Sequence, residues 1–174
     1  CLSVSKRDCI VQLSSGLVNL LSENELAFVI GHEVGHHILE HSLSHSQEQS
    51  LELMMQKRAQ EISVDRVGLY CCSDISYAMS AMIKTISGLS EKHLGLDIAS
   101  FISQTKKLIR PDEGEGHQST HPSLLVRCRA LLWFFQPKML KDLSNGNFNF
   151  DFSEINKRVE SEMDKFVEGP IKKN

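Results

Sequence analysis

Apolar residues recur at helical spacing along much of the chain, which predicts a mostly helical fold. The clearest stretch has apolar side chains that fall on one helical face, at Leu26, Val29, Ile30, Val34 and Ile38. Just before it, Ser22 and Glu25 form a capping box, in which the hydroxyl and the carboxylate each bind an otherwise free backbone N–H. We therefore expect a helix that starts near residue 23 and extends at least to about His41.

Other segments are predicted to be helices or short strands. Further helices are expected over about 48–71, 74–87 and 97–109, from Pro122 to about Phe135, and along the charged tail 153–167. A strand is expected over 9–14, followed by a break at Ser15-Gly16. Phe148, Phe150 and Phe152 alternate with polar residues, which is the period of a strand.

Composition and charge restrict the classes of function. With 174 residues, 41% of them hydrophobic, the chain is long enough for one compact domain with a buried core. Nineteen basic and 22 acidic residues give a net charge of −3, which argues against nucleic-acid binding and against a polybasic membrane anchor. No apolar run approaches the roughly 20 residues needed to span a bilayer, so we expect a soluble domain without a transmembrane segment.

The cysteines and the first residue bear on location. Five cysteines, an odd number without the spacing of a disulfide framework or a zinc ribbon, favour a reducing compartment and hence the cytoplasm. Because the chain begins with Cys1, we favour a fragment of a longer protein over a lipidated mature N-terminus. For a fragment, a bacterial envelope-associated location also fits.

Histidines are concentrated where chemistry is expected. Five of the eight lie between residues 32 and 45. Two of these form the motif His32-Glu33-Val34-Gly35-His36, an H-E-x-x-H on the predicted helix. Histidines four apart project from one helical face and can reach a single zinc ion, while Glu33 lies beside them to polarise a metal-activated water. The alternative is a polar helix face with solvated histidines.

A second predicted helix offers a third ligand. Glu61 and Asp65 are four residues apart on one face, a like-charge pair that is unfavourable unless cations lie nearby. A zinc ion and a zinc-bound imidazole would compensate it, with Glu61 as ligand and Asp65 accepting from the free N–H of a ligand ring. The alternative is neutralisation of a solvated face by the basic residues Lys57, Arg58 and Arg66.

Four blocks in this order resemble a known family. They are Gly16-Leu17 with Ser22-x-x-Glu25-Leu26; Gly31-His32-Glu33-Val34-Gly35-His36; Glu61-x-x-x-Asp65-Arg66-x-Gly68-Leu69; and Thr120-His121-Pro122 with Arg127. Together they resemble the gluzincin zinc peptidases of the HtpX, Oma and CAAX-prenyl-protease family. The resemblance implies an α+β, mostly helical, zincin-like domain over residues 1–136, with a small β-sheet bordering the cleft. Residues 137–174 would then be a C-terminal extension packed on it, with a possible regulatory role.

The resemblance also implies a role for each site residue. It implies one Zn²⁺ per chain, held by His32, His36 and Glu61, with Glu33 as general base and then general acid. Asp65 would orient a ligand ring, and Arg127 would hold its helix near the site. His121 matches the position that faces the substrate carbonyl.

The position of His121 gives an independent reason for this role. It precedes Pro122 at a predicted helix start, where a side-chain donor and the positive helix end together could stabilise an oxyanion. The alternative for His121 is an ordinary cap in a surface loop.

The expected substrate is a protein or peptide. The segment Leu13, Ser14, Ser15 and Gly16 resembles the family's cleft-bordering region, which would bind an extended peptide by strand addition. Gly31 and Gly35 are costly in a helix interior, so we expect close packing there, beneath the substrate strand. His41 and His45 match no ligand position and are interpreted as surface residues or adventitious metal contacts.

Two other functions compete with a zinc endopeptidase. One is a latent or catalytically silent zinc-binding interaction module, whose cleft is filled by a terminal segment such as Asn147–Phe152. The other is a helical protein without metal.

Overall fold

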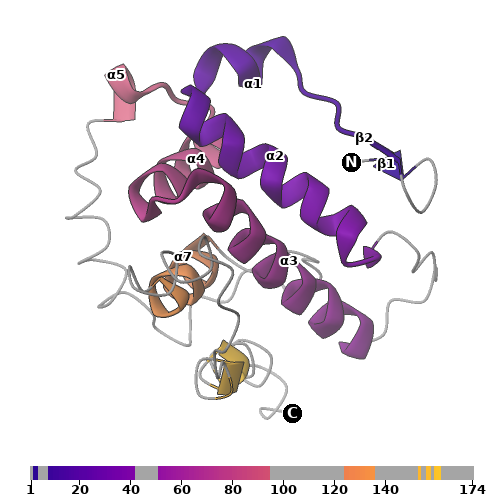
Figure 1. The fold of residues 1–174 in the computed structure, drawn as a ribbon. Coiled ribbons are helices and arrows are strands. Elements are labelled where there is room, and N and C mark those ends of the chain that lie inside the picture. The colour runs from indigo at the N-terminus through magenta and orange to yellow at the C-terminus, as the bar shows by residue number, and fades with distance from the viewer. Residues whose placement is uncertain are drawn as a thin grey trace.

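Helices make up nearly all of the regular structure in this computed structural model (Figure 1). The structure describes residues 2–3, 8–41, 51–94, 124–135, 153, 156–157 and 159–161. The predicted helix over 97–109, the Thr120-His121-Pro122 element and the predicted strand at Phe148–Phe152 lie outside these residues.

Six helices and two very short strands are described. The helices are α1 (Ser15–Leu20), α2 (Glu23–Ile38), α3 (Leu51–Cys72), α4 (Ile75–Ser87), α5 (Glu91–Leu94) and α7 (Leu124–Phe134). Strands β1 (Leu2–Ser3) and β2 (Cys9–Ile10) pair antiparallel, with Leu2 opposite Ile10 and Ser3 opposite Cys9. The prediction of a mostly helical fold is confirmed, and the sheet found in the described part is this single pair.

The predicted strand over 9–14 is correct only for Cys9 and Ile10. The chain has no regular structure from residue 11 to 14 and then enters α1, where a break at Ser15-Gly16 was expected. The reason is a local hydrogen bond: the Ser14 hydroxyl accepts from the Leu17 backbone N–H at 3.2 Å and caps the helix.

The pairing of α2 with α3 is the central feature of the fold (Figure 1). The helices run antiparallel, because Gly31 lies against Gly68 and Cys71 while Gly35 lies against Val64 and Val67. A Cβ on Gly31 would come within 2.7 Å of the Cys71 sulfur. The expected close packing is thus present, but its partner is α3 and not a substrate strand.

Two clusters of buried side chains hold the helices together. The larger joins α2, α3, α4 and α7 through residues that include Phe28, Leu69, Met79, Met82 and Leu131. The smaller contains Ile62, Val126, Ala130 and Val159. Since Ile62 follows Glu61 and Val126 precedes Arg127, this second cluster supports the backbone at both residues.

The start of α2 is fixed by a buried ionic network. The predicted capping box is present: the Ser22 N–H donates to Glu25 Oε2 at 2.7 Å, and the Ser22 hydroxyl accepts from the Glu25 N–H at 3.4 Å. The same carboxylate accepts from Lys84 of α4 at 2.8 and 3.0 Å, and from the Ser80 hydroxyl. Burial alone would raise the pKa of Glu25, but the bonds from Lys84, Ser80 and Ser22 lower it overall.

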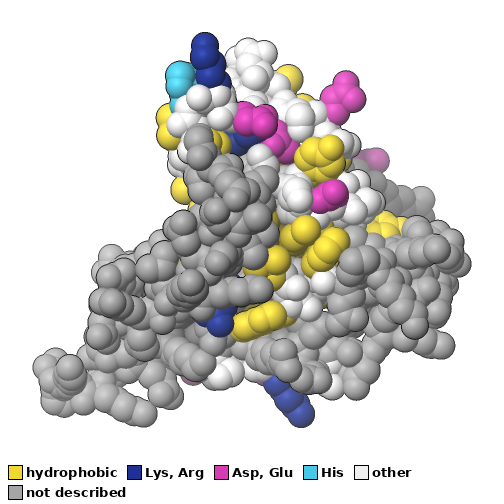
Figure 2. Space-filling model, turned by 90° about the vertical axis from the view of Figure 1, so that its left-hand side faces the viewer, with side chains coloured by type: hydrophobic (Ala, Val, Ile, Leu, Met, Phe, Trp, Pro, Cys, Tyr) yellow, Lys and Arg dark blue, Asp and Glu magenta, His cyan; other side chains and the backbone are white. Residues whose placement is uncertain are grey.

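The surface of the described part carries both signs of charge. On the face turned toward the viewer in Figure 2, acidic and basic side chains are both visible among hydrophobic ones. Exposed apolar side chains on or next to α4 are Tyr77, Ile86 and Leu89.

Within the residues described, none of the helices combines the length and the apolar character needed to cross a bilayer.

Candidate metal centre

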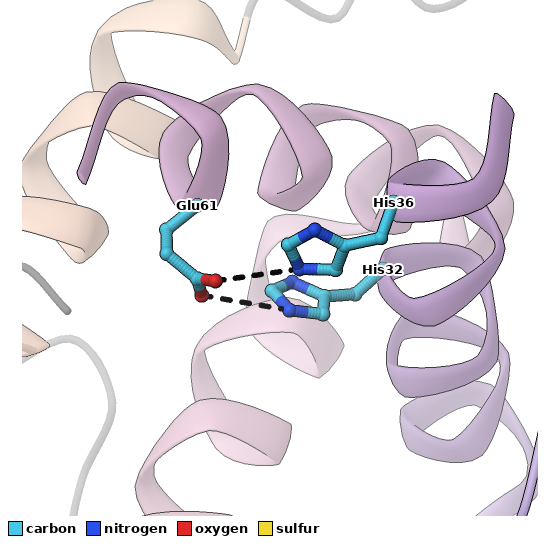
Figure 3. Close-up of side chains that lie close together, drawn as sticks. All are labelled: His32, His36 and Glu61. Carbon is cyan, nitrogen blue, oxygen red and sulfur yellow. Dashed lines mark ion pairs between the residues drawn. The ribbon is translucent and has the colours of Figure 1, made fainter. Parts of the chain in front are cut away.

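Three side chains from two helices point at one another. His32 and His36 project from the same face of α2, and Glu61 reaches toward them from α3 (Figure 3). One ligand atom from each residue lies within 4.8 Å of the other two. The spacing of the histidines is a property of the helix, whereas the position of Glu61 depends on the antiparallel packing of α3 on α2.

The distances suit a metal ion. His36 Nε2 lies 3.3 Å from Glu61 Oε1, and His32 Nε2 lies 3.6 Å from Glu61 Oε2. Two atoms that each lie about 2.0–2.1 Å from a tetrahedral zinc ion are about 3.3 Å apart. The three groups are also acceptors when the imidazoles are neutral, so a shared cation would relieve the repulsion between their lone pairs. His32, His36 and Glu61 could therefore hold a metal ion.

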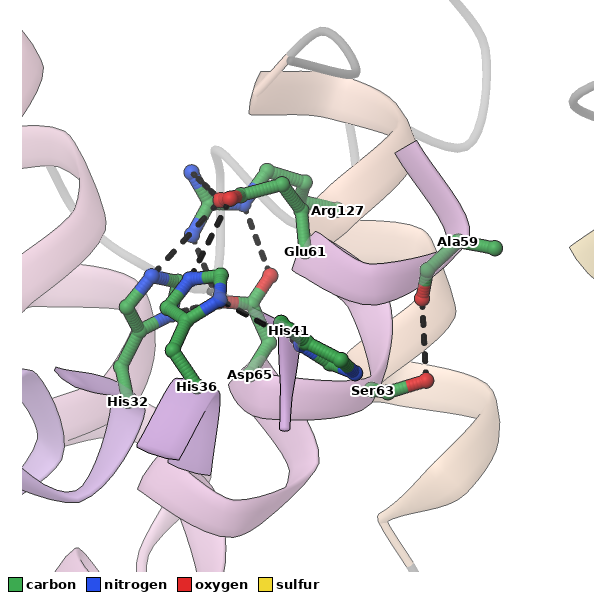
Figure 4. Close-up of polar contacts among 8 residues, drawn as sticks. All are labelled: His32, His36, His41, Ala59, Glu61, Ser63, Asp65 and Arg127. Atoms are coloured by element: carbon green, nitrogen blue, oxygen red, sulfur yellow. Dashed lines mark hydrogen bonds and ion pairs between the residues drawn. The ribbon is translucent and has the colours of Figure 1, made fainter. Parts of the chain in front are cut away.

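Asp65 holds the other side of the His32 ring. Its Oδ1 lies 2.9 Å from His32 Nδ1, so the carboxylate accepts when Nδ1 carries the proton (Figure 4). The tautomer with the proton on Nδ1 leaves the Nε2 lone pair directed toward Glu61. This arrangement is the one that a ligand histidine requires.

Arg127 of α7 neutralises Asp65. Its Nε donates to Asp65 Oδ2 at 2.7 Å and its second terminal nitrogen donates to Oδ1 at 2.5 Å, a bidentate pair. The carboxyl group is fully buried, which alone would raise its pKa, but Arg127 and then His32 lower the pKa of Asp65 below its usual value. Arg127 also lies 3.9 Å from Glu61 Oε2.

His41 contacts His36, a relationship that the sequence analysis missed. The Nδ1 atoms of the two rings are 3.3 Å apart, and the ring planes meet at 73° (Figure 4). Helix α2 ends at Ile38 with Leu39 as its C-cap, and Glu40 adopts a φ of 55°, which turns the chain back. A left-handed residue that is not glycine is uncommon, so this turn is hard to predict from the residue types alone.

The remaining predicted site residues are placed as follows. Glu33 lies on α2 next to His32 and is half-buried. Leu13 and Ser14 precede α1, whereas Ser15 and Gly16 are its first residues, so their helical backbone does not present the extended edge needed for strand addition. His121 lies outside the described residues.

Comparison with known protein families finds a match for the segment that contains His32 and His36. Residues 4–56 match peptidase family M48. The match spans α2 with His32, Glu33 and His36, and it ends before Glu61 and Asp65. It confirms the predicted family resemblance and supports a metallopeptidase. None of the curated proteins matches the chain, and no solved structure matches it.

Proposed function

We propose that this chain is a zinc-dependent endopeptidase. The observation that carries the proposal is the convergence of His32, His36 and Glu61, with Asp65 holding His32 in the tautomer that leaves Nε2 free for a metal. The match of residues 4–56 to peptidase family M48 supports the same reaction class.

The donor set favours a catalytic zinc ion over a structural one. Two histidines and one carboxylate are three protein ligands, and catalytic zinc sites keep the fourth position for water or substrate. Structural zinc sites are typically built from cysteines with or without histidines, whereas His32, His36 and Glu61 give the donor types of a catalytic site. When bound, zinc would polarise the scissile carbonyl and make water a better nucleophile at neutral pH.

Glu33 is proposed to move the proton. Glu33 follows His32 in α2 and is the glutamate of the H-E-x-x-H motif. In this role its carboxylate would take a proton from the attacking water and deliver it to the leaving amine nitrogen. His121 is proposed to donate a hydrogen bond to the developing oxyanion, a role that rests on its motif. Arg127 would act indirectly, by fixing the carboxylate of Asp65.

The proposed substrate is a protein or peptide bound along α2. The chain that follows β2 and the helix α1 lie on the side of α2 away from α3 in Figure 1. Since Ser15 and Gly16 are helical, peptide pairing by strand addition would use β2 and the non-helical residues that follow it, up to Ser14.

A catalytically silent zinc-binding module is the second candidate. Residues of the C-terminal extension lie against the helices that carry the site: Asn156 Oδ1 accepts from Arg66 at 2.9 Å, and Val159 is buried beside Ile62. The division into a domain over 1–136 and an extension over 137–174 packed on it is proposed on these contacts. An extension held this close to α3 could also restrict the cleft.

Zinc content and hydrolysis together test the proposal. The whole chain is dialysed against metal-free buffer, its zinc is measured, and casein hydrolysis is followed before and after treatment with a chelator. We expect about one zinc per chain and hydrolysis that is lost with the chelator and restored by zinc. Retained zinc without hydrolysis would favour the silent module, and no zinc would contradict both candidates.

A further inference from the structure

The rings of His36 and His41 face each other through their Nδ1 atoms. Their Nδ1 atoms are 3.3 Å apart, and both rings are only partly exposed. The other nitrogen of His36, Nε2, lies 3.3 Å from Glu61 Oε1 at the candidate metal centre. The His36 ring thus lies between Glu61 on one side and His41 on the other (Figure 4).

The direction of this hydrogen bond follows from the proposed ligand role. A neutral imidazole carries one proton, and a metal ion binds the nitrogen that lacks it. If Nε2 of His36 binds zinc, its proton is on Nδ1 and is donated. The His41 Nδ1 must then be the acceptor, and the proton of His41 must be on its Nε2.

We propose that His41 is a positioning residue that accepts the hydrogen bond of His36 Nδ1–H and so fixes the tautomer and ring orientation needed for metal binding. The proposal rests on the proposed zinc site. Each ligand histidine then has its own acceptor: Asp65 of α3 for His32, and His41, just beyond the end of α2, for His36. Loss of such an acceptor typically weakens metal binding 10–100-fold.

The backbone after α2 places His41 for this contact. The Leu39 N–H bonds back to Gly35 O at 3.0 Å, and the Glu40 N–H bonds to His37 O at 3.1 Å. The first bond still follows the α-helical pattern, whereas the second reaches only three residues back. Together with the positive φ of Glu40, this tighter turn ends the helix and returns the chain toward His36. Along a continuous α-helix, residues five apart do not share a face, so this contact needs the turn.

Zinc affinity of His41 variants tests the proposal. In His41→Asn, the amide oxygen stands where Nδ1 stood and can still accept, whereas His41→Phe keeps a ring without an acceptor. The matched control is His93→Phe on α5, an exposed histidine far along the chain. Zinc dissociation constants are measured on the whole chain by competition with a chromophoric chelator, and Co²⁺ absorption spectra report the geometry of the site.

We expect His41→Phe to bind zinc at least about tenfold more weakly and to alter the Co²⁺ spectrum, with His41→Asn close to wild type and His93→Phe unchanged. Equal affinity of His41→Phe and wild type would overturn the proposal. Equal weakening in both His41 variants would also overturn it, because a ring-packing role would then suffice. If His41→Phe does not fold, judged by circular dichroism, His41→Leu takes its place, since it too lacks an acceptor.

The outcomes separate this proposal from the proposed function. Zinc binding by wild type with weaker binding by His41→Phe supports the role of His41 even if no peptide is cleaved. Peptide cleavage with unchanged zinc affinity in His41→Phe would remove the role of His41 and leave the peptidase standing. Absence of zinc binding in wild type would overturn both.

Discussion

Asp65 on α3 accepts a hydrogen bond from Nδ1 of His32 on α2, with 2.9 Å between the two atoms. The contact links the two helices that carry the candidate metal ligands, and the Asp65 carboxylate is itself held by two bonds from Arg127. One buried carboxylate therefore connects α2, α3 and α7 at the point where the chemistry is proposed.

Replacing Asp65 by Asn is expected to weaken zinc binding. The amide is neutral and supports the imidazole less well than a carboxylate, so we expect a loss of about 10-fold or more in zinc affinity. The affinity is measured by chelator competition. Asp74→Asn is the control, because Asp74 caps α4 with its side chain and Asn caps equally well. The Asp65 role would be contradicted if the two variants bound zinc with the same affinity.

Glu25→Gln is expected to destabilise the fold in a pH-dependent way. The folded state lowers the pKa of Glu25 from 4.5, so its ionised form stabilises the fold. That stabilisation is present above the unfolded-state pKa and is lost as the pH falls through the lower folded-state pKa. At neutral pH the variant leaves Lys84 buried without its main partner, at a cost of about 3 kcal/mol.

Urea unfolding at a series of pH values checks this prediction. The difference in free energy of unfolding between wild type and Glu25→Gln should shrink as the pH falls below about 4.5. Glu23→Gln, an exposed change in the same helical turn, is the control. A constant difference at every pH would argue that the charge of Glu25 does not stabilise the protein.

Gly68→Ala is expected to push α2 and α3 slightly apart and so to lower the stability of the fold. A Cβ on Gly68 would lie 2.7 Å from the Phe28 carbonyl oxygen, which is backbone and cannot rotate away. We expect a loss of about 1–3 kcal/mol in the free energy of unfolding, because the helices must move apart. Gly16→Ala is the matched control: its nearest neighbour is the Ser14 hydroxyl at 3.9 Å, so Ala in that helix should be neutral or stabilising. Similar stability of the two variants would be evidence against the tight crossing.

Cys128 is expected to be an unreactive thiol in the folded protein. Burial, and then the charge of Asp65, raise its pKa to about 12, so almost no thiolate is present near neutral pH. Alkylation followed by mass spectrometry should leave Cys128 unmodified in the folded protein and modify it after denaturation in urea. Equal labelling in both states would show that Cys128, on the inner face of α7, is not buried in the folded protein.

Features that depend on neighbours in the sequence were predicted well. The capping box set the start of α2 at Glu23, and Asp74 marks the start of α4 within a residue of the expected position. Both signals act within one helical turn. The H-E-x-x-H spacing likewise places two imidazoles on one face without any knowledge of the fold.

Features that depend on tertiary packing or on unusual backbone were predicted less well. The meeting of Glu61 with the histidines needs the antiparallel contact between α2 and α3, which rests on Gly31, Gly35 and Gly68. The glycines indicated close packing without showing which element would fill the space. The contact of His41 with His36 depends on a positive φ at Glu40, for which no glycine gave a signal.

The most direct test of the central claim compares peptide cleavage by wild type and Glu33→Gln at equal zinc content. The substitution keeps the size of the side chain and removes its ability to take a proton from water. We predict that both proteins bind about one zinc per chain and that a peptide library is cleaved by wild type alone, with turnover by Glu33→Gln reduced by at least about 100-fold. Comparable cleavage by the zinc-loaded Glu33→Gln variant would contradict the account.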